Sequence, residues 1–270
     1  MPDERGEASL ARGGVGEPPL DRIGPTERPH DRPAGFQRWR TLCFLHWPVA
    51  IDAVRAVLPP GLSVDSYEGR AWVGVVPFTM RDVVPFWAPS VPGVSNFHEL
   101  NVRTYVHFEG KNPGVFFLSL DAASSVAVLA ARAGWSLPYF RARMSLAVEG
   151  PAAPADPTGA LVRYSSRRLW PGPKPAELEL VYRVGAPVGT APPGTFEHFL
   201  AERYILYAMR GGRLQIGRVH HRPYPLQRAE VLELDQSMVR AAGLPEPKGA
   251  PHALFSPGVD VDVFALRAVS

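Results

Sequence analysis

The stretch that decides the fold is SNFHELNVRTYV, residues 95–106. Side chains of a β-strand point alternately to its two faces. One face of this stretch is mostly apolar and includes Leu100, Val102 and Val106. The other face carries an acid, an amide, a base and a phenol in successive positions, Glu99, Asn101, Arg103 and Tyr105. The alternation predicts a strand whose polar face either meets water or forms the wall of a site.

Strand signals recur on both sides of this stretch, and helical signals are fewer. The patterns predict strands at 36–48, 71–80, 97–108, 115–121, 141–148, 161–168, 176–184 and 214–220. They predict helices at 51–58, from Ser124 or Ser125 to 133, at 196–209 and, more weakly, at 236–243. Many strands with few helices in one long domain predict a mainly β (α+β) fold whose sheet curls or closes.

Composition divides the chain into a tail and one domain. Residues 1–34 are rich in Pro, Gly, Arg and Glu and show no apolar periodicity, which predicts a disordered tail. Residues 35–270 are expected to form a single domain, because 46% of the chain is hydrophobic and its 270 residues fit one large core. The single Cys43 cannot form an internal disulfide and indicates a packed thiol in a reducing compartment.

Charge and hydropathy exclude two classes of partner. The net charge is +3, but the 29 basic residues are scattered among acids without the clustered stripe that phosphate binding needs, so no nucleic-acid partner is expected. No run of apolar residues approaches the length of a membrane span, and the first residues lack the pattern of a secretory signal. The sequence predicts a cytoplasmic protein without a membrane partner.

Polar residues on other strands would complete a site if the polar face of 97–106 points inward. Asp121 shares one face of the following strand with Ser119, and Arg141 shares one face of a later strand with Arg143. His46 ends the first strand and is a further candidate for a pocket wall. Carboxylates and guanidiniums of such a pocket would pair with each other.

Other chemical motifs are weak or absent. His220 and His221 are adjacent and point to opposite faces of a strand, so they cannot easily bind one ion. No nucleophile elbow, phosphate loop, dinucleotide fingerprint or helical zinc motif occurs. We therefore expect neither a metal nor a cofactor.

A series of ordered motifs carries a family likeness. They are LHWPV (45–49), LPPGL (58–62), AWVGVVPF (71–78), FHELNVRTYV (97–106), FLSLDA (117–122), LPY (137–139) and VHHRPYPL (219–226). With these motifs the chain resembles the YqjF-like conserved bacterial proteins, a family of unknown function. The resemblance covers about residues 36–268.

That family in turn resembles acetoacetate decarboxylase, whose fold is a closed antiparallel β-barrel with a central cavity. By this resemblance the essential buried glutamate of the decarboxylase falls on Glu99. The lysine pair that includes the Schiff-base lysine falls on Tyr139 and Phe140, and neither side chain has an amine. The resemblance therefore implies a cavity with the glutamate and without the lysine chemistry. It also makes a homo-oligomer plausible.

Two functions follow as hypotheses. In the first, the cavity binds a small carbonyl or carboxylate metabolite and performs lysine-independent lyase, dehydratase, aldolase or cyclase chemistry. Glu99 would be the acid or base, Tyr139 a proton donor, and Arg103 and Arg141 would hold a carboxylate or enolate. The remaining candidates for substrate binding are Asn101, Tyr105, His46 and Asp121. In the second hypothesis the same groups form a structural network or hold a ligand in a non-catalytic small-molecule-binding protein. A lesser alternative gives the basic N-terminal arm an interaction role.

Overall fold

The computed structural model describes residues 20–85, 95–135, 137–150, 157–172 and 175–269. Its strands are β1 (Gly35–Val49), β2 (Leu62–Val64), β3 (Ala71–Pro85), β4 (Phe97–Phe108), β5 (Lys111–Ala122), β6 (Tyr139–Glu149), β7 (Leu161–Trp170), β8 (Glu177–Gly189), β9 (Ile205–Arg210), β10 (Arg213–His221), β11 (Leu226–Gln236), β12 (His252–Val263) and β13 (Arg267–Ala268). Its helices are α1 (Ile51–Arg55), α2 (Ser125–Trp135), α3 (Phe196–Ala201) and α4 (Met238–Ala241), with a short 3-10 turn, η1 (Gly24–Thr26). The fold is mainly β with few helices. None of the helices in these ranges is long and apolar enough to cross a membrane.

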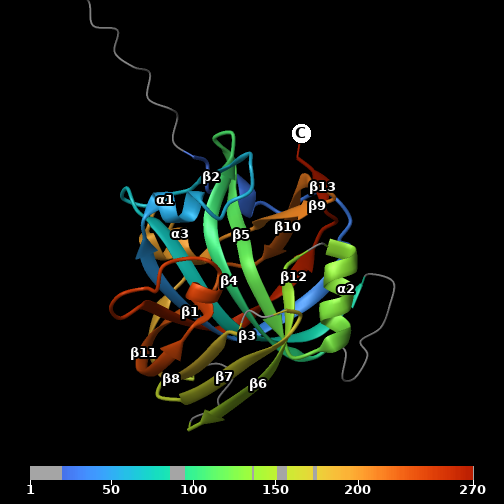
Figure 1. Ribbon diagram of the computed structural model, residues 1–270. Coiled ribbons are helices and arrows are strands. Elements are labelled where there is room, and N and C mark those ends of the chain that lie inside the picture. Colours follow the sequence, from blue (N-terminus) through green and yellow to red (C-terminus); the bar gives the residue numbers. More distant parts are fainter. Residues whose placement is uncertain (1–19, 86–94, 136, 151–156, 173–174, 270) are drawn as a thin grey trace, which may run out of the picture.

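All of these strands belong to one sheet. Their order is β13-β10-β9-β5-β6-β7-β8-β11-β12-β1-β3-β4-β2, and β10 also pairs with β12 and β5 with β4. Figure 1 shows β4 and β5 side by side through the middle of the molecule, with β6, β7 and β8 as a layer below them and α2 at one side. The long central strands β1, β3, β4 and β5 therefore each have a paired strand at both edges.

Two pairings differ from the purely antiparallel sheet implied by the resemblance. β5 runs parallel to β6 and parallel to β9. A parallel neighbour requires the chain to cross back before it pairs again, and α2 makes that crossing between β5 and β6. β9 is reached only after the chain has formed β6, β7, β8 and α3.

The predicted helix at 196–209 is wrong in its second half. α3 ends at Ala201, and residues 205–210 form β9. The side chain of Arg203 bonds the carbonyl of Phe199 through Nε at 2.7 Å, which satisfies an acceptor at the end of the helix. Beyond it, Tyr204 and Ile205 have β-branched or aromatic side chains, which suit a strand.

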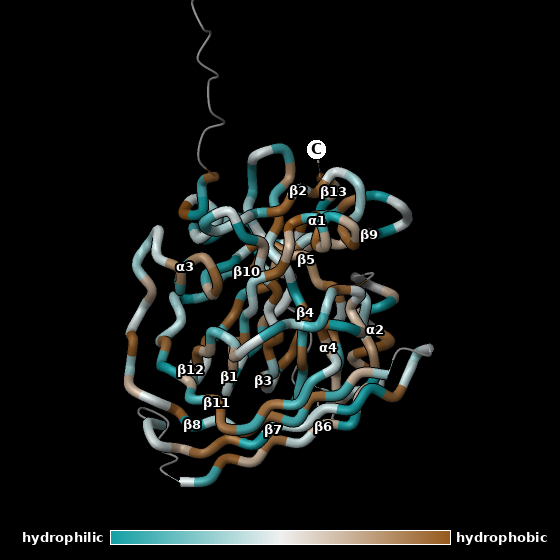
Figure 2. Tube along the Cα trace, turned by 60° about the vertical axis from the view of Figure 1, so that its left-hand side comes forward, coloured by the Kyte–Doolittle hydropathy of each residue, from teal (hydrophilic) through white to brown (hydrophobic). Residues whose placement is uncertain are grey.

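The two faces of β4 are separated as the alternation predicts. Leu100 and Val102 have no exposed surface and pack in a core that also contains residues of β1, β3, β7, β8 and α4. The β6–β8 layer thus covers the apolar face of β4, and teal and brown alternate along its strands in Figure 2. The polar face of β4 points to the opposite side, which is the cavity described below.

Residues 20–34 differ from the disordered tail expected at 1–34. Arg28 forms an ion pair with Asp262 of β12, and Arg218 of β10 donates to the carbonyl oxygens of Pro25 and Glu27. Arg22 pairs with the buried carboxylate of Asp65. Charged side chains, rather than an apolar face, attach this segment, so an analysis of apolar periodicity missed it. Residues 1–19 lie outside the described residues.

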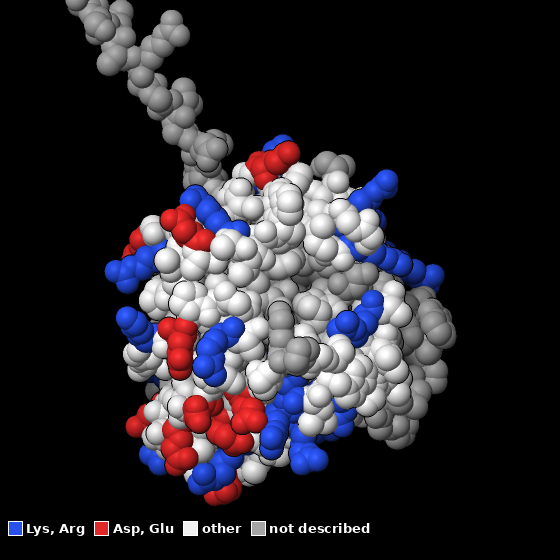
Figure 3. All heavy atoms as spheres, viewed as in Figure 1, with Lys and Arg blue, Asp and Glu red and all other residues white. Residues whose placement is uncertain are grey.

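The surface of the β6–β8 layer mixes both charges. Arg163 pairs with Glu149, Arg167 with Glu177, and Arg183 lies near Glu230. In Figure 3 red and blue side chains lie next to each other on the lower left of the face shown. Much of the positive charge of this layer therefore has an acidic neighbour.

Candidate functional site

A cavity of about 480 Å³ lies against the polar face of β4. Most of its wall is apolar and comes from β1, β3, β4 and β5, and Phe44, Phe78, Phe97 and Phe117 are among the aromatic contributors. The ionisable residues that line it are Glu99, Arg103, Tyr139, Arg203 and Tyr224. The volume is that of a site for a small organic molecule, and its few polar groups would determine how such a molecule is oriented.

Strand register sets the order of groups along the wall. Across β3 and β4, Phe78 is opposite Glu99, Val76 is opposite Asn101, and Gly74 is opposite Arg103. A methyl group at Gly74 would lie 2.9 Å from Nε2 of His46 and 3.4 Å from Cγ of Arg103. The ring of His46 therefore leaves no room for a side chain at position 74, and the aliphatic part of Arg103 lies at van der Waals distance beside it.

Glu99 and Tyr139 form the acidic end of the cavity. The Tyr139 hydroxyl donates to Oε2 of Glu99 over 2.8 Å, and the Tyr164 hydroxyl donates to the Glu99 carbonyl oxygen over 2.9 Å. Burial raises the pKa of Glu99 to about 8, the negative charge of Asp121 adds to the rise, and the bond from Tyr139 opposes it. Glu99 therefore carries a proton at neutral pH and can donate a hydrogen bond.

Arg103 forms the basic end of the cavity and is 8% exposed. Its Nη2 donates to the carbonyl oxygen of Leu200 over 2.9 Å, and its Nε has no hydrogen-bond partner. Among the residues that the structure describes, no carboxylate forms an ion pair with it. The buried carboxylate of Glu202 interacts with this charge electrostatically without forming an ion pair. A buried guanidinium that lines a cavity and has no carboxylate bound to it is a site for an anion.

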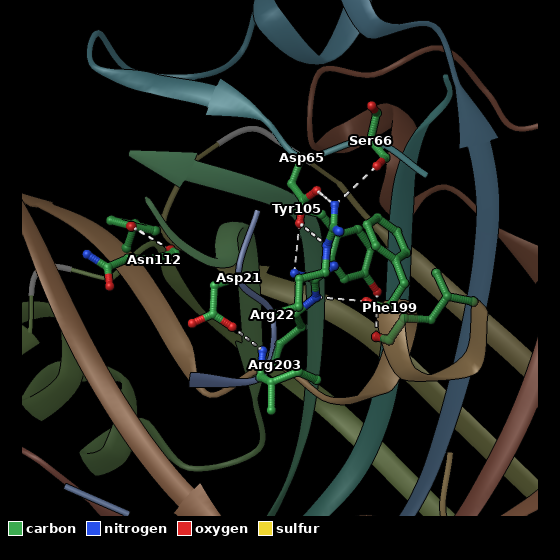
Figure 4. A network of polar contacts seen from close by, with 11 residues as sticks. Asp21, Arg22, Asp65, Ser66, Tyr105, Asn112, Phe199 and Arg203 are labelled. Atoms are coloured by element: carbon green, nitrogen blue, oxygen red, sulfur yellow. Dashed lines mark hydrogen bonds and ion pairs between the residues drawn. The ribbon is translucent and has the colours of Figure 1, made fainter. Parts of the chain in front are cut away.

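Arg203 is the second guanidinium on the wall, and its charge is balanced. Its Nη1 lies 2.8 Å from Oδ2 of Asp65, and Arg22 binds the same carboxylate from the N-terminal segment. Figure 4 shows the three side chains in a row beside the rings of Tyr105 and Phe199. The Arg203 guanidinium lies 4.4 Å from the centre of the Phe199 ring. This row fixes the wall next to Arg103.

Tyr105 and His46 lie behind the wall. The Tyr105 hydroxyl donates to the Leu200 carbonyl oxygen over 2.7 Å, and Nε2 of His46 lies 2.7 Å from the same hydroxyl. Burial and the charges of Arg103 and His252 hold the pKa of His46 well below its usual range. Neither residue is part of the cavity lining, so the structure gives both a supporting position rather than the ligand contact expected of them.

Asp121 and Arg141 are not brought to the cavity. Asp121 is opposite Leu100, and so it lies on the apolar, outward face of the pair β4–β5, where Arg168 binds it through two hydrogen bonds of 2.7 and 2.6 Å. Nε of Arg141 bonds the Ser125 hydroxyl at the start of α2 over 3.2 Å. The expected enclosure of one pocket by the polar faces of these strands is wrong, because only β4 turns its polar face to the cavity.

Arg203, Asp65 and Tyr224 are site residues that the sequence did not indicate. A signal for Arg203 was present, since Glu202 and Arg203 interrupt the apolar run of 199–209. Charged residues in such a run tend to be paired when they are buried. Within the described part of the chain, no group of three or more His, Cys, Asp or Glu side chains is placed to hold a metal ion.

The fold and the cavity together describe a mainly β protein whose mostly apolar cavity contains a buried glutamate, Glu99, and a buried arginine, Arg103. The sequence model of DUF2071, a family described as an uncharacterised conserved protein, matches residues 36–260. The chain belongs to this family, which confirms the predicted resemblance. The uncharacterised protein YqjF of Bacillus subtilis (strain 168) is 36% identical over 232 residues, which cover 86% of this chain and 90% of YqjF.

Solved structures share the fold at low sequence identity. The enduracididine biosynthesis enzyme MppR, in complex with pyruvate, has a TM-score of 0.60 at 16% identity and covers 90% of this chain and 93% of its own. An acetoacetate decarboxylase-like enzyme from Sphingomonas wittichii RW1 has a TM-score of 0.59 at 13% identity, with 89% and 94% covered. The acetoacetate decarboxylase of Legionella pneumophila has a TM-score of 0.56 at 14% identity, with 92% and 94% covered.

Proposed function

We propose that the cavity binds a small organic carboxylate that also bears a carbonyl group. The observation that carries the proposal is the guanidinium of Arg103, which lines a mostly apolar cavity, has a free Nε and forms no ion pair with a carboxylate of the described residues. A ligand carboxylate would supply the missing counter-charge and would accept hydrogen bonds from the guanidinium. The proposal includes a closed barrel around the cavity, and the series of pairings β5–β4–β3–β1–β12–β10–β9–β5 supports it.

Glu99 is the acid in this proposal. Because its pKa is raised to about 8, its proton is present at neutral pH and would be donated to the carbonyl oxygen of the ligand. Tyr139 orients the carboxyl group by donating to Oε2. Such polarisation is the first step of dehydratase, aldolase, cyclase and other lyase-like reactions. The carbonyl acids named for the structural neighbours, pyruvate and acetoacetate, support this ligand class.

The chemistry is proposed to be independent of lysine. Of the two positions that correspond to the decarboxylase lysines, only Tyr139 faces the cavity, and Phe140 lies on the other face with the Arg168 guanidinium 3.7 Å from its ring centre. No lysine occurs among the described residues that line the cavity. A Schiff base with the substrate therefore has no amine to form it.

A non-catalytic binding protein is the second candidate, and the ionisable groups of the wall favour it. Glu99 carries its proton at neutral pH because its pKa is raised to about 8, and burial raises the pKa of Tyr139 and of Tyr224 above that of a free phenol. None of these groups can then accept a proton from a ligand. Binding without turnover is the outcome expected of such a wall unless acid catalysis by Glu99 alone is sufficient.

One experiment tests both candidates. The purified chain is titrated with a panel of oxo acids, by thermal shift and calorimetry, and the mixtures are then analysed by mass spectrometry. Arg103→Met is expected to weaken carboxylate binding by about tenfold or more, because it removes a charge-assisted pair. Arg141→Met is the matched control and should bind as the wild type does. Equal binding by wild type and Arg103→Met contradicts the proposal, and conversion of a bound ligand excludes the non-catalytic candidate.

A further inference from the structure

Resting on the proposed function, we infer that the ligand has two polar ends: a carboxylate at Arg103 and, beyond an apolar skeleton, a carbonyl or hydroxyl group at Glu99 and Tyr139. Both anchors belong to the inward face of β4.

The two anchors are four residues apart on one strand. A strand rises by about 3.3 Å per residue, so the Cα atoms of Glu99 and Arg103 are separated by about 13 Å. Their cross-strand neighbours repeat the separation, since Phe78 is opposite one anchor and Gly74 is opposite the other. The separation is therefore a property of the sheet and does not depend on a rotamer.

The side chains of the two anchors are held by different partners. Arg103 bonds the Leu200 carbonyl oxygen at the end of α3, and its guanidinium carbon lies 5.6 Å from the ring centre of Phe44 and 5.9 Å from that of Tyr105. Glu99 is held by Tyr139 of β6, which enters the wall beside the end of β5. Each anchor is thus fixed by a contact on its own side of the cavity.

Electrostatics agree with this separation. Burial raises the pKa of Tyr224, the charge of Arg103 opposes the rise and that of Glu202 adds to it, which places Tyr224 near Arg103. The pKa of Glu99 responds to burial, to Tyr139 and to Asp121.

The wall between the anchors is mostly apolar. Leu120 and Val76 flank Asn101, and Phe117 is opposite Arg103. Asn101 is the polar exception, and its Oδ1 has no hydrogen-bond partner. A short 2-oxo or 3-oxo acid has its carbonyl within one or two bonds of the carboxylate and would leave one anchor and most of the 480 Å³ unused. A carboxylate with a remote carbonyl contacts both ends and fills the space between them.

Two isomers of one ligand test the inference on the wild-type chain. In 2-oxooctanoate the ketone is next to the carboxylate, and in 7-oxooctanoate it is near the other end, while size, charge and composition are equal. Calorimetry at pH 7 is expected to show that 7-oxooctanoate binds about tenfold more tightly, since only this isomer brings a carbonyl to Glu99. Octanoate, which has no ketone, should bind with the affinity of the 2-oxo isomer.

Variants separate the anchors. Within the Glu99→Met variant, 7-oxooctanoate should lose its advantage over octanoate and the two compounds should bind equally, whereas Arg103→Met should weaken all three compounds. Equal or tighter binding of 2-oxooctanoate by the wild type overturns the inference and leaves the proposed function in place. Binding of none of the three, together with no binding of the short oxo acids, overturns the proposed function itself.

Discussion

Each face of the β4–β5 pair is in contact with a buried arginine, and the two arginines differ in whether a carboxylate binds them. On the outward face Arg168 is 8% exposed and is bound by both oxygens of Asp121, with the Phe140 ring against it. On the cavity face Arg103 is equally buried and has one carbonyl bond, and no carboxylate of the described residues forms an ion pair with it, although Glu202 interacts with its charge electrostatically. Nη1 of Arg168 and Nε of Arg103 both lack a hydrogen-bond partner, so the difference between the two arginines is the bound carboxylate of Asp121. The charge of Arg168 is matched within the protein, whereas Arg103 keeps binding capacity for another molecule. Burial alone does not distinguish a structural arginine from a ligand-binding one, and the counter-ion does.

Removal of the counter-ion from the outward face should have the largest effect on stability. Asp121→Ala leaves the Arg168 guanidinium buried without a partner, which is expected to cost about 3–5 kcal/mol in the free energy of unfolding. Urea denaturation measures the change. The double variant Asp121→Leu with Arg168→Met removes both charges and should recover most of the loss. A single variant as stable as the wild type would contradict a structural role for the pair.

The protonated acid of the cavity face should make stability depend on pH. The folded-state pKa of Glu99 is raised to about 8 from an ordinary value of 4.5. The unfolded chain releases the proton at lower pH than the folded chain, so stability falls as pH rises between these values. The expected loss between pH 5 and pH 8 is about 3 kcal/mol. Glu99→Gln should flatten this part of the profile of stability against pH. An unchanged slope in the variant would show that a group other than Glu99 causes the pH dependence.

The row formed by Arg22, Asp65 and Arg203 is expected to contribute less to stability than the Asp121–Arg168 pair and more than Arg103. Arg22 is partly exposed, and Asp65 keeps Arg203 as a partner when Arg22 is removed. Arg22→Ala is therefore expected to cost only about 1 kcal/mol, measured by urea denaturation. Asp65→Ala leaves the buried Arg203 guanidinium without its carboxylate partner and without access to water. This variant should lose several times more of the free energy of unfolding. Similar losses of stability in the two variants would mean that the stabilising partner of the Asp65 carboxylate is Arg22 rather than Arg203.

Loss of the unpaired arginine should affect stability least. Arg103→Met removes a buried charge that forms no ion pair with a carboxylate of the described residues, and the Leu200 carbonyl oxygen keeps its bond from Tyr105. We expect a change within about 1 kcal/mol in the free energy of unfolding, together with the loss of carboxylate binding. A large destabilisation, comparable to that of Asp121→Ala, would show that the two arginines are both structural.

The central strand could be predicted from the sequence because its own pattern contains the information. Residues 97–108 alternate, and the structure has β4 at Phe97–Phe108 with the polar face toward the cavity. The position of Glu99, Asn101 and Arg103 on one wall follows from this period alone. The roles assigned to them stay predictions.

The neighbouring strand could not be read in the same way. β5 contains the continuous apolar run Val115–Leu118, which has no alternation to indicate its inward face. Register irregularities with β4 also place Ser119 opposite Val102 and Asp121 opposite Leu100, and nothing within either strand specifies this pairing. The prediction of one helix at 196–209 was wrong for another reason. The end of α3 is fixed by contacts of Glu202 and Arg203, either with residues that are distant in sequence or with the helix itself.

The missing side chain at Gly74 has a consequence for ligand affinity. The backbone of β3 leaves space there for the aliphatic part of Arg103 and for the ring of His46. An alanine at this position would come within 2.9 Å of Nε2 of His46 and would press on the ring that contacts the Tyr105 hydroxyl. Tyr105 and Arg103 bond the same Leu200 carbonyl oxygen, so the residue at position 74 acts on the basic anchor through His46 and Tyr105. Related chains that differ at this one position are expected to bind a ligand carboxylate with different affinity.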